Sequence, residues 1–64
     1  MINLVVGQLF ENQKFVVEIM KIEGGVVYTN YYSVDNGSEV SVEFKSRDFE
    51  IRMLLQGFMQ VEAE

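Results

Sequence analysis

The stretch that decides the fold is KFVVEIMKIEGGVVYTNYYS, residues 14–33. Residues 14–22 alternate between two faces and are mostly β-branched or aromatic, which is the pattern of a β-strand. Residues 26–33 have a similar composition, and the Gly24-Gly25 step between the two runs tolerates the positive φ angles of a tight turn. The stretch therefore predicts an antiparallel hairpin.

The alternation assigns side chains to the two faces of each strand. One face of the first strand is expected to carry Phe15, Val17 and Ile19, and the other to carry Val16, Glu18, Met20 and Ile22. The second strand has bulk on both faces, with Val26, Tyr28 and Tyr32 on one and Val27 and Tyr31 on the other. A sheet with one solvated face alternates more cleanly, so we expect the second face of residues 26–33 to be covered as well. The second cover is either the chain's own helix or a binding partner.

A third strand follows the segment Asp35-Asn36-Gly37-Ser38. Asn-Gly can adopt the primed turn whose twist matches its flanking strands, so this segment predicts a second hairpin. Residues 39–45 then alternate cleanly. The inward positions are expected to be Val40, Val42 and Phe44, and the positions facing water Glu39, Ser41, Glu43 and Lys45.

The period changes to a helical one after residue 45. Apolar residues recur at helical spacing over residues 47–56, Ser46 or Asp48 is a candidate N-cap, and Gly57 ends the pattern. Short strands are expected at residues 7–10, before an Asn-Gln turn, and at residues 58–62. These elements predict one mainly β domain over residues 1–64, an SH3-like partly open barrel or curled antiparallel sheet of about five strands with one short C-terminal helix.

The polar inventory argues against catalysis. The chain has no His and no Cys, and its ten acidic residues are scattered, so the usual nucleophiles, bases and metal ligands are missing. Glu39 and Glu43 share a strand face, but four residues at ~3.4 Å place them roughly 13 Å apart, too far for paired acid–base work. The Asp35 to Glu39 turn lacks the spaced carboxylates of a calcium loop. We expect a non-enzymatic protein without cofactor or metal.

Charge and size indicate which partners to expect. A net charge of −5 opposes phosphate binding, so nucleic acid is not the expected ligand. The absence of Cys and of any apolar run near the ~20 residues that span a bilayer predicts a cytoplasmic protein without membrane insertion. A chain of 64 residues builds a thin core. Ordering the chain costs about 1.5 kcal/mol per residue, so its net stability is a small difference between large terms. A protein partner or a second copy is therefore expected to add buried area.

Tyrosines and surplus apolar helix residues are the candidate contacts. Tyrosine contributes apolar area and a hydroxyl at low entropic cost, and is favoured at interfaces. The helix carries apolar side chains on more than one stripe, which indicates burial on two sides. The predicted protein interface consists of Tyr28, Tyr31, Tyr32, Met53 and Leu54.

The spacing of apolar residues and turns resembles the short SH3-like barrel proteins of phages and prophages. The similar segments are the opening Gly7-Gln8-Leu9-Phe10, the strands at 15–19 and 26–28, Phe49, and the closing Gly57-Phe58-Met59-Gln60-Val61. The helical stretch is longer than in such barrels, which leaves a hairpin-plus-helix α+β arrangement open, and no functional residue carries over. The resemblance implies a phage accessory protein of unknown function that binds or inhibits a host factor. The alternatives are a nucleic-acid-associated module or DNA-mimicking inhibitor, and a structural subunit of a homo-oligomer.

Overall fold

The fold is a curled, open antiparallel sheet with one helix lying across its concave side. The computed structural model describes residues 4–61. Its elements in chain order are β1 (Leu9–Glu11), β2 (Phe15–Glu23), β3 (Val26–Ser33), β4 (Glu39–Lys45), α1 (Ser46–Leu55) and β5 (Met59–Val61). The strands are ordered β4-β3-β2-β1-β5, and every neighbouring pair is antiparallel.

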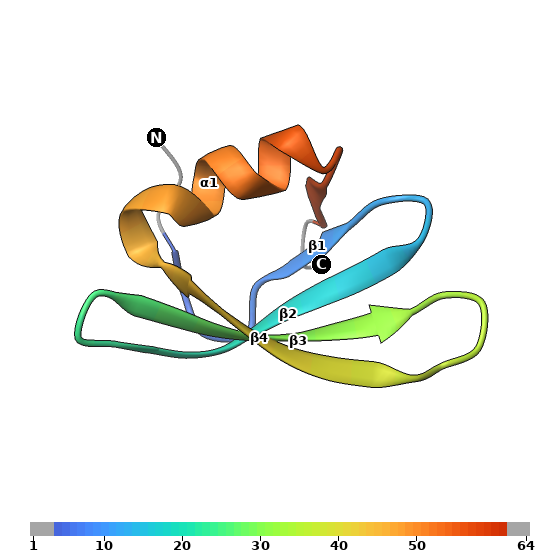
Figure 1. Ribbon diagram of the computed structural model, residues 1–64, viewed down its shortest axis with the longest axis horizontal. Coiled ribbons are helices and arrows are strands. Elements are labelled where there is room, and N and C mark those ends of the chain that lie inside the picture. Colours follow the sequence, from blue (N-terminus) through green and yellow to red (C-terminus); the bar gives the residue numbers. More distant parts are fainter. Residues whose placement is uncertain (1–3, 62–64) are drawn as a thin grey trace.

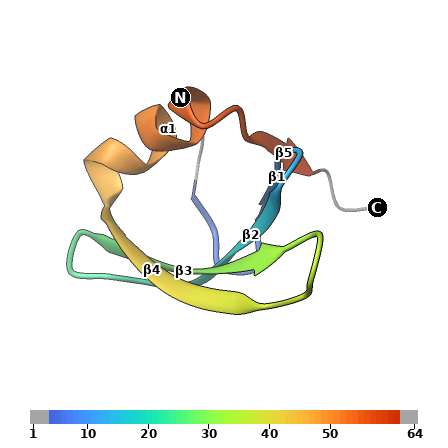
Figure 2. The same cartoon turned by 45° about the vertical axis from the view of Figure 1, so that its right-hand side comes forward.

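Strands β4 and β5 are the two edges of this sheet and do not pair with each other, so the barrel is not closed. The sheet curves around α1, which lies over its inner face (Figure 1). A view turned by 45° shows α1 above β3 and β4, with β1 and β5 rising on the other side (Figure 2). The expected class, a mainly β partly open barrel or curled sheet of five strands with one short C-terminal helix, is confirmed.

The two hairpin turns of the meander differ. Gly24 and Gly25 have φ angles of 60° and 77° between the paired residues Glu23 and Val26, as a two-residue primed turn requires. At the second hairpin only Gly37 has a positive φ, and Asn36 has a negative one. The primed Asn-Gly turn that the sequence predicts is therefore not formed.

A longer turn takes its place between β3 and β4. The backbone N–H of Gly37 donates to the carbonyl of Ser33 at 3.0 Å, and the N–H of Ser33 donates to the carbonyl of Ser38 at 2.8 Å. The Asn36 side-chain oxygen accepts from the N–H of Ser38 at 2.9 Å. Asn36 acts through its side chain, which satisfies the turn without a left-handed backbone at that residue.

A β-bulge in β2 changes which side chains face inward. Ile19 pairs with Thr29 and Lys21 pairs with Tyr28, so Met20 is an extra residue in the ladder. Beyond it, Ile22 pairs with Val27 on the inner face and packs against the core. The expectation that Ile22 lies on the outer face is therefore wrong, because one inserted residue reverses the alternation of everything that follows.

Helix α1 spans Ser46–Leu55, one residue earlier at each end than expected. The predicted caps do not form: Lys45 occupies the N-cap position without a side-chain hydrogen bond, and the N–H of Ser46 donates to the carbonyl of Gly25 at 2.8 Å. The predicted stop at Gly57 does form. The N–H groups of Gly57 and Phe58 donate to the carbonyls of Leu54 and Met53 at 3.1 Å and 2.9 Å, which is the Schellman pattern.

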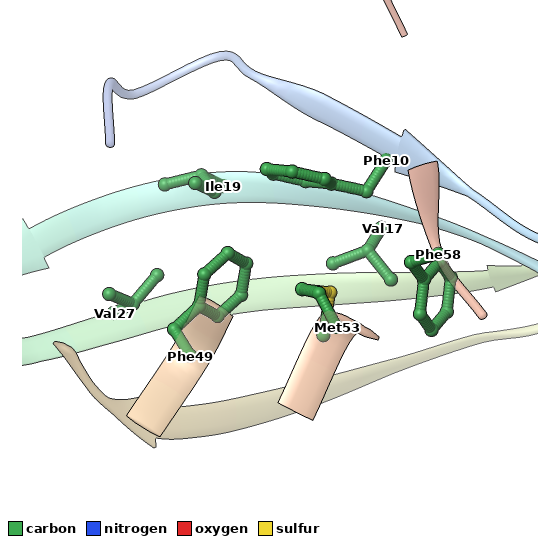
Figure 3. Close-up of a cluster of buried hydrophobic side chains, with 7 residues drawn as sticks. All are labelled: Phe10, Val17, Ile19, Val27, Phe49, Met53 and Phe58. Atoms are coloured by element: carbon green, nitrogen blue, oxygen red, sulfur yellow. The ribbon is translucent and has the colours of Figure 1, made fainter. Parts of the chain in front are cut away.

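The core lies between α1 and the inner face of the sheet. Its buried members are Phe10, Val17, Ile19, Val27, Phe49, Met53 and Phe58. Figure 3 shows Phe49 and Met53 projecting from α1 toward the side chains of the strands. The ring of Phe49 packs edge-to-face on Phe10, with centroids 5.4 Å apart, and on Phe44, at 5.5 Å. These contacts determine which face of the helix points inward.

Candidate interaction surface on helix α1

Two of the predicted interface tyrosines lie on the outer, convex face of the sheet. Tyr28 and Tyr32 alternate along β3 on the side opposite Val27. The Lys21 ammonium lies 5.5 Å from the centroid of the Tyr28 ring. The Tyr32 hydroxyl donates to a carboxylate oxygen of Glu18 at 3.2 Å. Both rings are partly exposed, and each is in contact with one charged side chain.

Tyr31 points the other way, into the aromatic rim of the core. Its ring centroid lies 5.7 Å from Phe15, 6.2 Å from Phe44 and 5.7 Å from Phe58. Its hydroxyl lies 3.2 Å from the side-chain oxygen of Gln56. Burial raises the pKa of Tyr31, and the nearby Arg52 guanidinium acts in the opposite direction. Tyr31 is therefore part of the packing that joins the sheet to the end of the helix.

The two helix residues of the predicted interface also separate. Met53 is 3% exposed and belongs to the core, whereas Leu54 is 68% exposed. The five predicted residues thus occupy the outer sheet face, the rim of the core, the core itself and the surface of the helix. The chain's own helix covers the inner face of β3, whereas Tyr28 and Tyr32 on the outer face are partly exposed.

The outer side of α1 carries an apolar stripe that the sequence prediction captured only through Leu54. Ile51, Leu54 and Leu55 are 59%, 68% and 78% exposed. Their spacing of three and four residues puts them on one face. At 3.6 residues per turn this face lies about half a turn away from Phe49 and Met53. We call Ile51, Leu54 and Leu55 the helix stripe. The surplus of apolar residues was visible in the sequence, but not which of them would face the core.

Charged residues border the helix stripe. Arg47 and Asp48 lie one turn before it and Arg52 lies beside it, all of them exposed. Acidic and basic side chains occur together around the stripe, so this border is not dominated by one sign of charge. An exposed apolar patch with a polar border is typical of protein-binding surfaces.

The outer face of the sheet has a different character. The strand registers place five carboxylates on it, those of Glu11, Glu18, Glu23, Glu39 and Glu43. The lysines on the same face are Lys21 and Lys45, and Lys21 forms an ion pair with Glu23 at 3.2 Å. A face with this excess of acidic groups repels phosphate, so the sheet does not provide the electrostatic term that dominates nucleic-acid binding.

Within residues 4–61 no three acidic side chains come together in a group that could hold a metal ion. An open hollow lined by Asn12, Gln13, Lys14, Gln56 and Gly57 presents amide groups and one amine. The helix in this part of the chain is neither long nor apolar enough to cross a membrane. No protein-family model, curated protein or solved structure matches the chain.

Proposed function

We propose that this chain is a non-enzymatic protein-binding module that contacts its partner through the helix stripe. The observation that carries the proposal is the exposure of Ile51, Leu54 and Leu55 on the side of α1 that faces away from the core. Burying a large aliphatic side chain stabilises a protein or a complex by about 1.5–3 kcal/mol, and these three side chains do not gain that free energy while they face water. An amphipathic helix would carry polar residues there, as the core contacts are already made by Phe49 and Met53.

The charge distribution favours a protein over a nucleic acid as partner. The outer sheet face carries an excess of carboxylates, and the border of the helix stripe carries both signs of charge. A partner with an apolar groove and a mixed polar rim fits the stripe. Such binding depends weakly on salt, whereas phosphate binding falls steeply as salt is added.

The resemblance to phage and prophage barrel proteins supports a more specific proposal. In this proposal the chain is an accessory protein of a phage or prophage, acts in the cytoplasm, and inhibits or redirects a host factor by covering one of its surfaces. A small domain with one apolar stripe suits that role, because it needs no chemistry of its own. The identity of the host factor is the unknown that the experiment addresses.

The test is affinity capture from host lysate at low and high salt with three forms of the tagged protein. The first is the natural chain, the second carries Leu54→Ser and Leu55→Ser, and the third carries Val34→Ser as a matched control. Val34 is also an exposed aliphatic residue, 58% exposed, but lies in the turn between β3 and β4. Exposed substitutions of this kind usually change stability by no more than about 0.5 kcal/mol, which circular dichroism can verify.

We expect a stoichiometric protein partner that survives high salt, is retained by Val34→Ser and is lost with the double leucine variant. Two results would contradict the proposal. One is a partner whose capture does not depend on Leu54 and Leu55. The other is capture that disappears with added salt alone, which would support the nucleic-acid-associated alternative.

A further inference from the structure

We propose that the free edge of β4 pairs with β4 of a second copy of this chain, around a two-fold axis at Val42. The two five-stranded sheets then form one continuous antiparallel sheet. This surface is separate from the helix stripe, and the inference does not depend on the proposed function. Its grounds are the backbone orientation of β4, its length and regularity as an edge strand, and charge complementarity.

Two hydrogen bonds show which backbone groups of β4 face the open edge. The N–H of Ser33 donates to the carbonyl of Ser38, and the N–H of Ser46 donates to the carbonyl of Gly25. These bonds lie at opposite ends of the β3–β4 ladder and both involve even-numbered residues on the β4 side. Backbone groups alternate along an antiparallel strand. The N–H and C=O groups directed away from β3 therefore belong to Glu39, Ser41, Glu43 and Lys45.

Strand β4 lacks most of the features that usually protect an exposed edge. Such edges are kept short, are interrupted by Pro or a bulge, carry charged side chains, or have a charge on the inner face. Of these features β4 has only the charged side chains, and they all lie on its outer face. β4 has seven residues without Pro, its register with β3 runs without a shift, and its inner side chains are Val40, Val42 and Phe44. The opposite edge, β5, is only three residues long over its described part. Within residues 4–61, β4 pairs with β3 alone.

The sequence of β4 is complementary to itself about Val42. An antiparallel pair with its two-fold axis at this residue opposes Glu39 to Lys45 of the second copy, and Lys45 to its Glu39. On the same face Ser41 is opposite Glu43. On the inner face Val42 meets Val42, and Val40 meets Phe44. Opposite charges and apolar pairs directly across a ladder both stabilise it. Val40, now 59% exposed, would be covered.

The neighbouring registers oppose like charges or leave part of β4 unpaired. Placing the axis at Ser41 keeps the same backbone groups bonded but opposes Glu39 to Glu43 twice, and like charges directly opposite are destabilising. Placing it at Glu43 opposes two glutamates and leaves Glu39 outside the strand ladder. Val42 is the centre that pairs the whole of Glu39–Lys45 and sets unlike charges across from each other.

The first experiment uses two substitutions of Ser41 to distinguish an effect on edge pairing from an effect on folding. Ser41→Pro removes an N–H that faces the open edge and so has no role in the β3–β4 ladder. Ser41→Ala is the matched control, because both variants lose the hydroxyl that donates to Asn30 at 2.9 Å. Sedimentation equilibrium over a range of concentrations should show a dimer for the natural chain and for Ser41→Ala, and an association constant lowered at least about tenfold for Ser41→Pro. Circular dichroism verifies that the proline variant folds.

The second experiment identifies the register by charge exchange. Glu39 and Lys45 are six residues apart on one strand, roughly 20 Å, so their charges interact little within one chain. We expect Glu39→Lys and Lys45→Glu each to weaken association severalfold, and the double variant to restore it. Dimer formation should protect the backbone amides of Glu39, Ser41, Glu43 and Lys45 from hydrogen exchange. This protection should increase with protein concentration.

Several results would overturn the inference. A chain that stays monomeric at every concentration has no such edge pairing. A dimer unaffected by Ser41→Pro uses another surface, such as the helix stripe. Tighter association of Glu39→Lys, without rescue in the double variant, would place the axis at Ser41 instead of Val42.

Discussion

Replacing Tyr31 by Ser tests whether this residue belongs to the core or to a binding surface. The sequence is compatible with both, whereas the structure surrounds the Tyr31 ring with Phe15, Phe44 and Phe58 at centroid distances of 5.7–6.2 Å. The variant removes the whole ring and leaves a small polar side chain facing the aromatic rim. We therefore expect Tyr31→Ser to destabilise the folded state strongly.

The magnitude follows from burial and ring contacts. Replacing a fully buried Phe by Ala costs about 3–5 kcal/mol, and Tyr31 is only partly buried, so its area term lies at or below the lower end of that range. Edge-to-face pairs contribute about 0.5–1.5 kcal/mol each beyond area, and Tyr31 makes two of them, with Phe15 and Phe58. The two ring pairs together add about 1–3 kcal/mol to the area term, so we expect a loss of at least about 3 kcal/mol. The whole domain, at 64 residues, has roughly 3–10 kcal/mol to lose.

The assay is urea unfolding followed by circular dichroism, with all proteins at one concentration. Tyr32→Ser is the matched control, because it removes the same side chain from the next position of β3, on the outer face, and should cost about 1 kcal/mol or less. Tyr31→Phe keeps the ring and loses only the contact with Gln56, so it should stay within about 0.5 kcal/mol of the natural chain. Equal losses for Tyr31→Ser and Tyr32→Ser would refute the placement of Tyr31 in the core.

Three further predictions concern pH, a turn and the helix. Burial raises the folded-state pKa of Tyr31 above the ordinary 10.0, so this residue ionises at lower pH in the unfolded chain than in the folded one. The free energy of unfolding should therefore fall as the pH rises above 10.0 toward the folded-state pKa. Urea titrations over this pH range should show a smaller fall for Tyr31→Phe, which has no hydroxyl to ionise. Asn12→Ala should cost about 1–2 kcal/mol in thermal unfolding, because the Asn12 side chain accepts two backbone bonds in its own turn and donates to the carbonyl of Gln56 at 2.9 Å. Met53→Ala should cost about 2–5 kcal/mol and Leu54→Ala no more than about 0.5 kcal/mol; similar losses in urea unfolding would contradict the assigned helix faces.

Elements governed by contacts within a few residues were predictable from the sequence. The strands at 26–33 and 39–45 have the expected bounds, and the diglycine turn and the helix stop at Gly57 form as expected. Period-two alternation and positive φ angles are local properties, so the sequence reports them directly. The Asn-Gly turn and the helix N-cap were not predictable in the same way. Asn36 and Ser46 each have more than one way to satisfy nearby backbone groups, and the adjoining strands select among them.

By itself, then, the sequence determined a mainly β chain with five short strands and one late helix, and a polar inventory poor in catalytic groups. Only the tertiary structure decided which side chains point where. The bulge at Met20 turns Ile22 inward because β3 supplies its pairing partner. The helix is apolar on several sides, and its inner face is chosen because Phe49 and Met53 fill the space beside Phe10 and Val27. Burial depends on neighbours distant in the chain. Leu54 and Leu55 could therefore be assigned to the surface only when the structure showed which helix residues pack against the sheet.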